Sequence, residues 1–184
     1  MRALVVYESM YGNTHVIASN IADGLRATHE VTLVPVAEAT AVLVAEADLL
    51  VVGGPTHIHG LSTAASRQLA AKAAARLDSG LRLDPDAGGP GLRDWLSDLP
   101  GGHALAAAFD TRLTEIAVLT GRASRGIRKL LKRHGYWLVM PPESFLVSQR
   151  NILLKAEASR ARRWGAAVGA AATIAHVPAH ARAA

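Results

Sequence analysis

The chain has 184 residues, 50% of them hydrophobic, which is enough to bury the core of one domain. It contains no cysteine, so disulfides, zinc sites with cysteine ligands and thiol nucleophiles are excluded. The net charge of +5 is unevenly distributed. Residues 1–119 carry 8 basic and 13 acidic residues (−5), whereas residues 120–184 carry 12 and 2 (+10).

The first predicted elements are a strand over Ala3–Tyr7 and an amphipathic helix over residues 14–28. The turn between them is built from small and polar residues. Ser9 and Thr14 supply hydroxyl donors, and Gly12 permits a tight turn. Because the free N–H groups of a helix start point at an anion, this arrangement predicts a phosphate site.

Two common phosphate loops are excluded here. The turn lacks the Gly-Lys-Ser/Thr of triphosphate loops and the G-x-G-x-x-G of dinucleotide sites. Without a lysine or a metal-binding arrangement, the loop suits one terminal phosphate. The alternative is a strand–turn–helix unit that Ser9 and Asn13 cap and that holds no ligand.

This segment resembles the FMN phosphate loop of flavodoxins, whose pattern joins an apolar strand, an aromatic residue, hydroxyl residues, a small residue and apolar helix positions. One departure is that a third hydroxyl residue often stands where this chain has Met10 and Tyr11. The resemblance implies FMN as the cofactor. The fixed positions are met by Val5, Val6, Tyr7, Ser9, Gly12, Thr14, Ala18 and Ile21, and the phosphate would be held by Ser9, Met10, Tyr11, Gly12, Asn13 and Thr14.

Short continuous apolar runs indicate further strands buried on both faces of a parallel sheet. Helical stretches separate them, one of them over residues 62–77 with Ser62 as its cap, so we expect a doubly wound α/β fold. The resemblance adds a five-stranded, flavodoxin-like sheet in the order 2-1-3-4-5, with the ligand at the switch point. The later strands are expected at Val31–Val36, Leu49–Gly54, Ala104–Phe109 and Trp137–Val147.

Two regions interrupt this alternation. Residues 77–102 are rich in glycine and proline and are expected to form an elaborated connection with one short helix over Gly91–Leu99. Pro141 and Pro142 should break the last strand, because proline cannot donate to a sheet ladder. Gly165 and Gly169 in the final helix predict close helix packing.

The segment after the third strand, residues 53–60, lies where open α/β sheets bind ligands. By resemblance it lies along the flavin ring, and the His59-Gly60 peptide is the candidate partner of the reduced ring. We expect no metal at His57 and His59, since no third ligand has a suitable spacing. The residues implied to frame the ring are Pro55, Thr56, His57, Ile58, His59 and Gly60.

The end of the fourth strand resembles the family's other ring loop, and it implies Phe109, Asp110, Thr111 and Arg112. These loops lack the aromatic pair that usually encloses the ring in electron-carrier flavodoxins, so we expect weaker FMN binding or a more exposed ring. Arg112 would either stabilise an anionic reduced flavin or pair with Asp110 or Glu115.

A basic stripe follows on a helix whose other face is apolar. An acidic redox partner, a membrane surface or nucleic acid could bind such a stripe, and a solvated helix face is the alternative. It has no interleaved aromatic residues and no nucleic-acid motif, so nucleic acid is not expected. The stripe comprises Arg122, Arg125, Arg128, Lys129, Lys132 and Arg133.

The sequence therefore predicts an FMN-binding, flavodoxin-like electron-transfer protein with a redox partner protein, and the basic second half of the chain would suit an acidic one. The alternatives are an FMN-dependent oxidoreductase of a quinone or protoporphyrinogen-type substrate, and a flavodoxin fold without flavin that acts as a binding or regulatory module. No G-x-S-x-G elbow is present, and we predict no catalytic side chain and no metal.

Without a leader or a membrane span, the expected location is the cytoplasm. The expected organisation is one domain over residues 1–175 with a flexible tail over 176–184.

Overall fold

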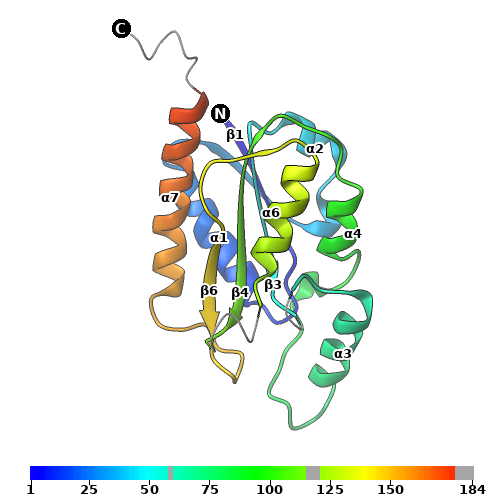
Figure 1. The fold of residues 1–184 in the computed structure, drawn as a ribbon. Coiled ribbons are helices and arrows are strands. Elements are labelled where there is room, and N and C mark those ends of the chain that lie inside the picture. Colours follow the sequence, from blue (N-terminus) through cyan, green and yellow to red (C-terminus); the bar gives the residue numbers. More distant parts are fainter. Residues whose placement is uncertain (58–59, 115–120, 177–184) are drawn as a thin grey trace, which may run out of the picture.

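In the computed structural model, residues 1–57, 60–114 and 121–176 are described. Their strands form one parallel sheet in the order β2-β1-β3-β4-β5, with a sixth strand also paired with β4 (Figure 1). This confirms the predicted parallel fold and strand order. The strands are β1 (Arg2–Tyr7), β2 (Glu30–Pro35), β3 (Leu49–Pro55), β4 (Leu105–Leu113), β5 (Trp137–Leu138) and β6 (Glu143–Val147).

The last predicted strand is divided in two. β5 pairs with the start of β4 and β6 with its end, and Pro141 and Pro142 lie between them. The break falls where the missing proline N–H groups predict it. One expectation is wrong: β4 does not end at Phe109 but continues to Leu113, because its last five residues find a partner in β6.

Helices cover both faces of the sheet (Figure 1). α1 and α7 lie on one face, α2, α4 and α6 on the other, and α3 lies beside the edge where the strands end. No helix among the described residues combines the length and the apolar character needed to cross a bilayer. The helices are α1 (Asn13–Leu25), α2 (Ala41–Glu46), α3 (Ala64–Ala74), α4 (Leu92–Ser97), α6 (Ala123–Arg133) and α7 (Glu157–His176), with the short 3-10 turns η1 (Val36–Glu38) and η2 (Pro85–Ala87).

The start of α3 differs from the prediction. Thr63, not Ser62, is its N-cap: the Thr63 hydroxyl accepts the N–H of Ser66, and the Ser66 hydroxyl accepts the N–H of Thr63. This reciprocal pair satisfies two backbone donors at once. Ser62 does not cap α3, because its hydroxyl donates to the buried carboxylate of Glu8 at 2.7 Å.

Close backbone contact joins α1 to α7, as the glycines of α7 predict. A Cβ atom added to Gly24 would lie 2.0 Å from the carbonyl oxygen of Arg162, and one added to Gly165 would lie 2.3 Å from that of Ile21. Both distances are far below any van der Waals contact. Glycine is therefore required at these two positions for the helices to approach this closely.

A cluster of charges fastens β6 to α7. Glu157 accepts the N–H of Leu146 at 2.8 Å, and Arg160 donates to Glu157 at 2.6 Å and to Glu143 at 2.5 Å. Arg160 also donates to the carbonyl oxygen of Ser144. Removal of Arg160 would leave the mostly buried carboxylate of Glu157 without its cation.

This cluster predicts a pH dependence of stability. Burial opposes ionisation, but hydrogen bonds from Arg160 and Leu146 and the charge of Arg160 outweigh it, so the pKa of Glu157 lies below its usual range. Such a carboxylate stabilises the fold above the pKa of the unfolded chain, and the stabilisation is lost as the pH falls through the folded value. We expect Glu157→Gln to lower stability at neutral pH and to flatten its decline in acid.

Urea unfolding at a series of pH values measures this effect, with exposed Glu30→Gln as the matched control. Parallel stability curves for the wild type and Glu157→Gln through the acid range would contradict it.

Candidate functional site

Three segments meet at the carboxyl edge of the sheet, beyond β1, β3 and β4. Together they line a recess of about 120 Å³. Most of the residues predicted to hold a cofactor lie around it, and Asn151 joins them from the segment after β6. The predicted residues that line it are Met10, Tyr11, Asn13, Thr14, Pro55, Thr56, His57, Thr111 and Arg112.

The loop after β1 has the geometry of an anion site. Gly12 is the N-cap of α1 with φ of 88°, in the left-handed region, and no side chain caps the helix there. The first N–H groups of α1 therefore have no acceptor within the helix. The side chains of Ser9 and Thr14 are buried next to them, at 1% and 2% exposure.

The hydroxyls of this loop are held in place. Ser9 Oγ accepts the N–H of Gly12 at 3.1 Å, and Thr14 Oγ1 lies 2.8 Å from Thr111 Oγ1 across the recess. A hydroxyl that accepts one hydrogen bond still has a proton to donate. Uncapped N–H groups beside oriented hydroxyls fit a phosphate group.

The ligand-free alternative assigned a capping role to Asn13, and the structure gives it another partner. The side-chain amide of Asn13 donates to the backbone carbonyl and the side-chain oxygen of Asn151, at 2.9 and 3.0 Å. Asn151 has φ of 57°, a conformation that asparagine tolerates better than most residues. No local sequence signal pointed to Asn151, because its role depends on a contact 138 residues away.

In the loop after β3, Thr56 supports α6. Its hydroxyl accepts the N–H of Ala123 at 3.0 Å, and its own N–H donates to Thr111. His57 and Gly60 exchange two backbone hydrogen bonds that close the turn, while Ile58 and His59 lie outside the described residues.

His57 is the imidazole that the described part of this loop brings to the recess. Burial lowers the pKa of His57, Glu8 opposes this shift and Arg67 adds to it. The imidazole of His57 therefore stays neutral at pH values low enough to protonate a free histidine.

At the end of β4, the four predicted residues divide into two pairs. Phe109 is fully buried and meets Phe145 and Trp164 edge to face, so it belongs to the core. Asp110 is also fully buried. Thr111 and Arg112 line the recess, where Arg112 Nη1 donates to the carbonyl oxygen of Leu113 at 2.9 Å.

The carboxylate of Asp110 caps α6 from the sheet, because its Oδ2 accepts the N–H of Ser124 at 2.7 Å. Burial raises the pKa of Asp110, and the hydrogen bond from the Ser124 N–H, the nearby hydroxyls of Ser124 and Ser144 and the charge of Arg112 act against this rise.

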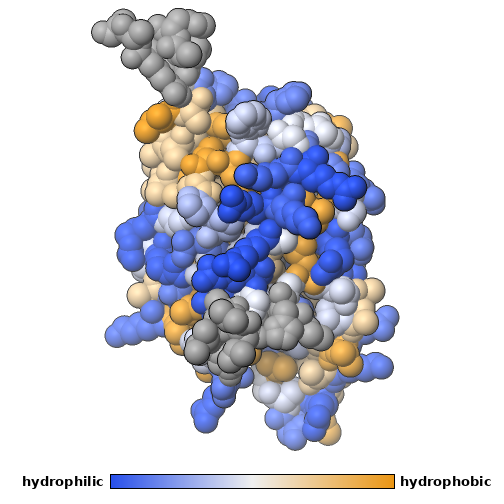
Figure 2. Space-filling model, viewed as in Figure 1, coloured by the Kyte–Doolittle hydropathy of each residue, from blue (hydrophilic) through white to orange (hydrophobic). Residues whose placement is uncertain are grey.

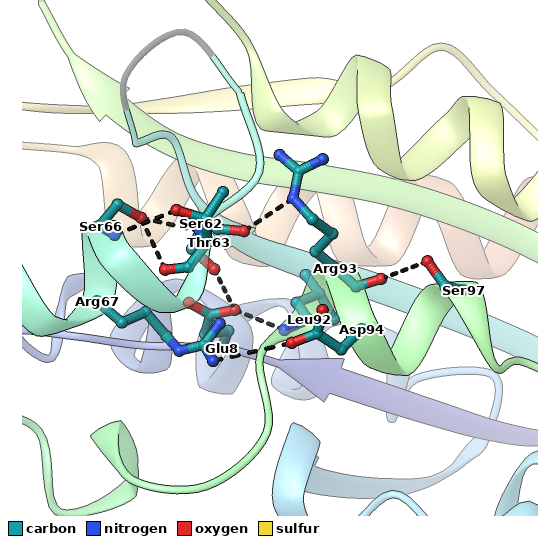
Figure 3. Close-up of polar contacts among 9 residues, drawn as sticks. All are labelled: Glu8, Ser62, Thr63, Ser66, Arg67, Leu92, Arg93, Asp94 and Ser97. Carbon is teal, nitrogen blue, oxygen red and sulfur yellow. Dashed lines mark hydrogen bonds and ion pairs between the residues drawn. The ribbon is translucent and has the colours of Figure 1, made fainter.

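Glu8 caps α4 as Asp110 caps α6. The sequence did not reveal this role, because Glu8 occupies a variable position of the loop pattern. The side chain is buried, and its Oε2 accepts the hydroxyl of Ser62 and the N–H of Leu92, both at 2.7 Å (Figure 3). Arg93 extends from α4 to the carbonyl oxygens of Leu61 and Ser62. These contacts fix the segment after β3 against α4.

The connection before α4 contacts β1, the segment that follows it and the start of α1, which the sequence did not reveal. The N–H of Asp84 donates to the carbonyl oxygen of Met10 at 2.9 Å, and the phenol of Tyr7 donates to Asp86 at 2.6 Å. His15 Nδ1 lies 3.4 Å from Asp84 and 3.6 Å from Asp86, and its ring stacks on Tyr7.

Ligand atoms of these two aspartates and His15 lie within 4.8 Å of one another, a spacing that a metal ion would accept. Burial and the carboxylate of Asp86 raise the pKa of Tyr7, so the phenol stays a hydrogen-bond donor.

Neither ring loop, in its described part, offers an aromatic face to the recess apart from His57. The single phenylalanine of these loops, Phe109, is buried. A flat ligand here would be covered less completely than between two aromatic side chains.

Comparisons with known proteins agree with this geometry. The family model described as Flavodoxin matches residues 5–95. No curated protein matches the chain in sequence.

Among solved structures, a flavodoxin from the domain Archaea is 18% identical with a TM-score of 0.65, covering 94% of this chain and 99% of that one. Flavodoxin 1 from Bacillus cereus is 18% identical with a TM-score of 0.62, covering 97% and 100%. The rubredoxin oxygen:oxidoreductase of Desulfovibrio gigas is 16% identical with a TM-score of 0.62, covering 94% of this chain and 36% of its own. At such identities the likeness shows the shared fold.

Proposed function

Because the chain is a flavodoxin-like protein, of a family whose cofactor is FMN, we propose that it carries electrons between redox partner proteins with a non-covalently bound FMN. One observation supports this most strongly: the uncapped start of α1, with the buried hydroxyls of Ser9 and Thr14 beside it, at the ligand-binding edge of the sheet. The positive charge of residues 120–184 supports an acidic partner. The expected cytoplasmic location is part of the same proposal.

In this proposal the phosphate is held by residues 9–14, and the ring is framed by residues 55–60 together with Thr111 and Arg112. Phe109, through its packing in the core, and Asp110, through its hydrogen bond to α6, hold these loops in place. FMN supplies the redox chemistry, and the protein holds and orients it. The neutral ring of His57 packs beside the flavin without adding a charge.

The first test is the absorption spectrum of the purified protein. We expect a yellow protein that quenches the fluorescence of added FMN at micromolar concentration and binds riboflavin more weakly, because riboflavin lacks the phosphate. A colourless protein with no quenching would refute FMN binding, and it would favour a flavin-free binding or regulatory module.

A second candidate is an FMN-dependent oxidoreductase of a diffusible substrate such as a quinone or a protoporphyrinogen. It is favoured by the lack of an aromatic cover in the described ring loops, and by His57 and Arg112 at the recess. Steady-state assays of the FMN-loaded protein with NAD(P)H and quinones test it. Turnover would support an enzyme, whereas electron exchange with protein partners alone would support a carrier.

A further inference from the structure

The outer face of α6 carries an unusual density of positive charge. Its buried side consists of Ala123, Ser124, Ile127 and Leu131. No ion pair within 1–57, 60–114 and 121–176 involves a cation of this face. The exposed cations, which we call the α6 basic face, are Arg125, Arg128, Lys129, Lys132 and Arg133.

The spacing of these charges lowers the stability of α6 itself. Arg125 and Lys129 are four residues apart, as are Arg128 and Lys132, and Lys129 and Arg133. Like charges at this spacing repel each other and destabilise a helix, whereas a solvated face is more stable when opposite charges alternate. The arrangement is therefore explained better by an external anion than by the fold.

The α6 basic face begins at the candidate site. The first N–H groups of α6 are bound by Thr56 and Asp110, which belong to the two ring loops. From there the helix runs over the sheet for about 16 Å, at 1.5 Å per residue. Figure 2 shows hydrophilic side chains across the part of the surface where Figure 1 places α6. A macromolecule seated on this face would lie beside the cofactor loops.

We propose that the α6 basic face docks an acidic protein partner, a proposal that rests on the electron-carrier function above. Opposite charges steer two proteins together and fix their orientation, and here they would bring the partner next to the ring loops.

Nucleic acid is disfavoured because α6 presents no aromatic side chain on which bases could stack. A membrane surface is disfavoured because the exposed residues of this face are all charged and offer no apolar side chain for insertion.

The test compares two double variants of equal charge change. Arg125→Glu with Lys129→Glu reverses two charges on α6, and Arg162→Glu with Arg163→Glu reverses two exposed charges on α7. The probe is an acidic two-iron ferredoxin, whose binding to the FMN-loaded protein is followed by calorimetry at low and high salt. A basic cytochrome c serves as the probe of opposite charge.

We expect the wild type to bind the ferredoxin at low salt and to lose this binding as salt rises. The α6 double variant should bind at least about tenfold more weakly, while the α7 double variant stays within about twofold of the wild type. Cytochrome c should show the opposite response, with binding improved by the α6 changes. Both variants should keep the FMN affinity of the wild type.

Equal weakening by both double variants would overturn the proposal, as would a wild type that does not bind the ferredoxin. The proposal would also be overturned if the α6 double variant lost more affinity for a single-stranded oligonucleotide or for phosphatidylserine vesicles than it lost for the ferredoxin. Failure of the wild type to bind FMN would refute the carrier function instead, and the same ferredoxin titrations, run on the flavin-free protein and its two double variants, would still test the α6 basic face.

Discussion

Replacing Gly24 with alanine is expected to lower the free energy of unfolding by about 3 kcal/mol, the cost of overpacking a close contact. The usual effect is the opposite, since alanine is favoured over glycine within helices by about 1 kcal/mol. Here the new methyl group would lie 2.0 Å from the carbonyl oxygen of Arg162, so α7 would have to move away from α1. Urea unfolding followed by tryptophan fluorescence, to which Trp164 at the same interface contributes, measures the change.

Two further variants make this prediction specific. Gly165→Ala should destabilise the fold in the same way, because its methyl group would meet the carbonyl oxygen of Ile21 at 2.3 Å. Gly126→Ala on α6 is the control: its methyl group would meet only the Leu61 side chain, at 3.3 Å, and stability should change by less than about 1 kcal/mol. If all three variants had the same stability, the close approach of α1 and α7 would be wrong.

Thr14→Val should weaken FMN binding by about ten- to a hundredfold. The substitution keeps the shape of the side chain but removes a buried hydroxyl, and a hydrogen bond to a charged group contributes about 1.5–3 kcal/mol. Riboflavin binding should change much less, because riboflavin has no phosphate. Fluorescence titration of both flavins measures the two dissociation constants.

The partner hydroxyl provides the matched control. Thr111→Val removes the other half of the 2.8 Å contact with Thr14 and leaves the proposed phosphate donor in place. FMN should then bind more tightly to Thr111→Val than to Thr14→Val. If both variants weakened FMN and riboflavin equally, Thr14 would serve the packing of the recess and not the phosphate.

Local signals predicted the buried strands and the candidate phosphate loop, whereas the strand order came from the resemblance to flavodoxins. Continuous apolar runs mark buried strands, and Ser9, Gly12 and Thr14 lie within six residues of one another. The end of β4 was assigned to a loop because residues 110–113 are mostly polar. Their strand partner, β6, begins 30 residues later, and no window of sequence contains both.

The polar side chains around the site show most clearly that local sequence patterns do not identify hydrogen-bond partners. Asp110 and Thr56 were assigned to the cofactor by the resemblance to flavodoxins, and in the structure their side chains accept N–H groups at the start of α6. Glu8 and Asp84 were missed because their partners, Leu92 and Met10, are distant in the sequence. Whether a polar side chain serves the fold or a ligand depends on such distant partners, and only the folded chain brings them together.

The close contact between α1 and α7 can form only late during synthesis of the chain. α1, which follows the candidate phosphate loop, is made early, while α7 leaves the ribosome more than a hundred residues later. Until then the side of α1 that carries Gly24 is uncovered, and part of the core between the sheet and α7 is open to water. We expect nascent chains that stop before α7 to be sensitive to protease and unable to retain FMN, so that cofactor capture is a late step in the making of this protein.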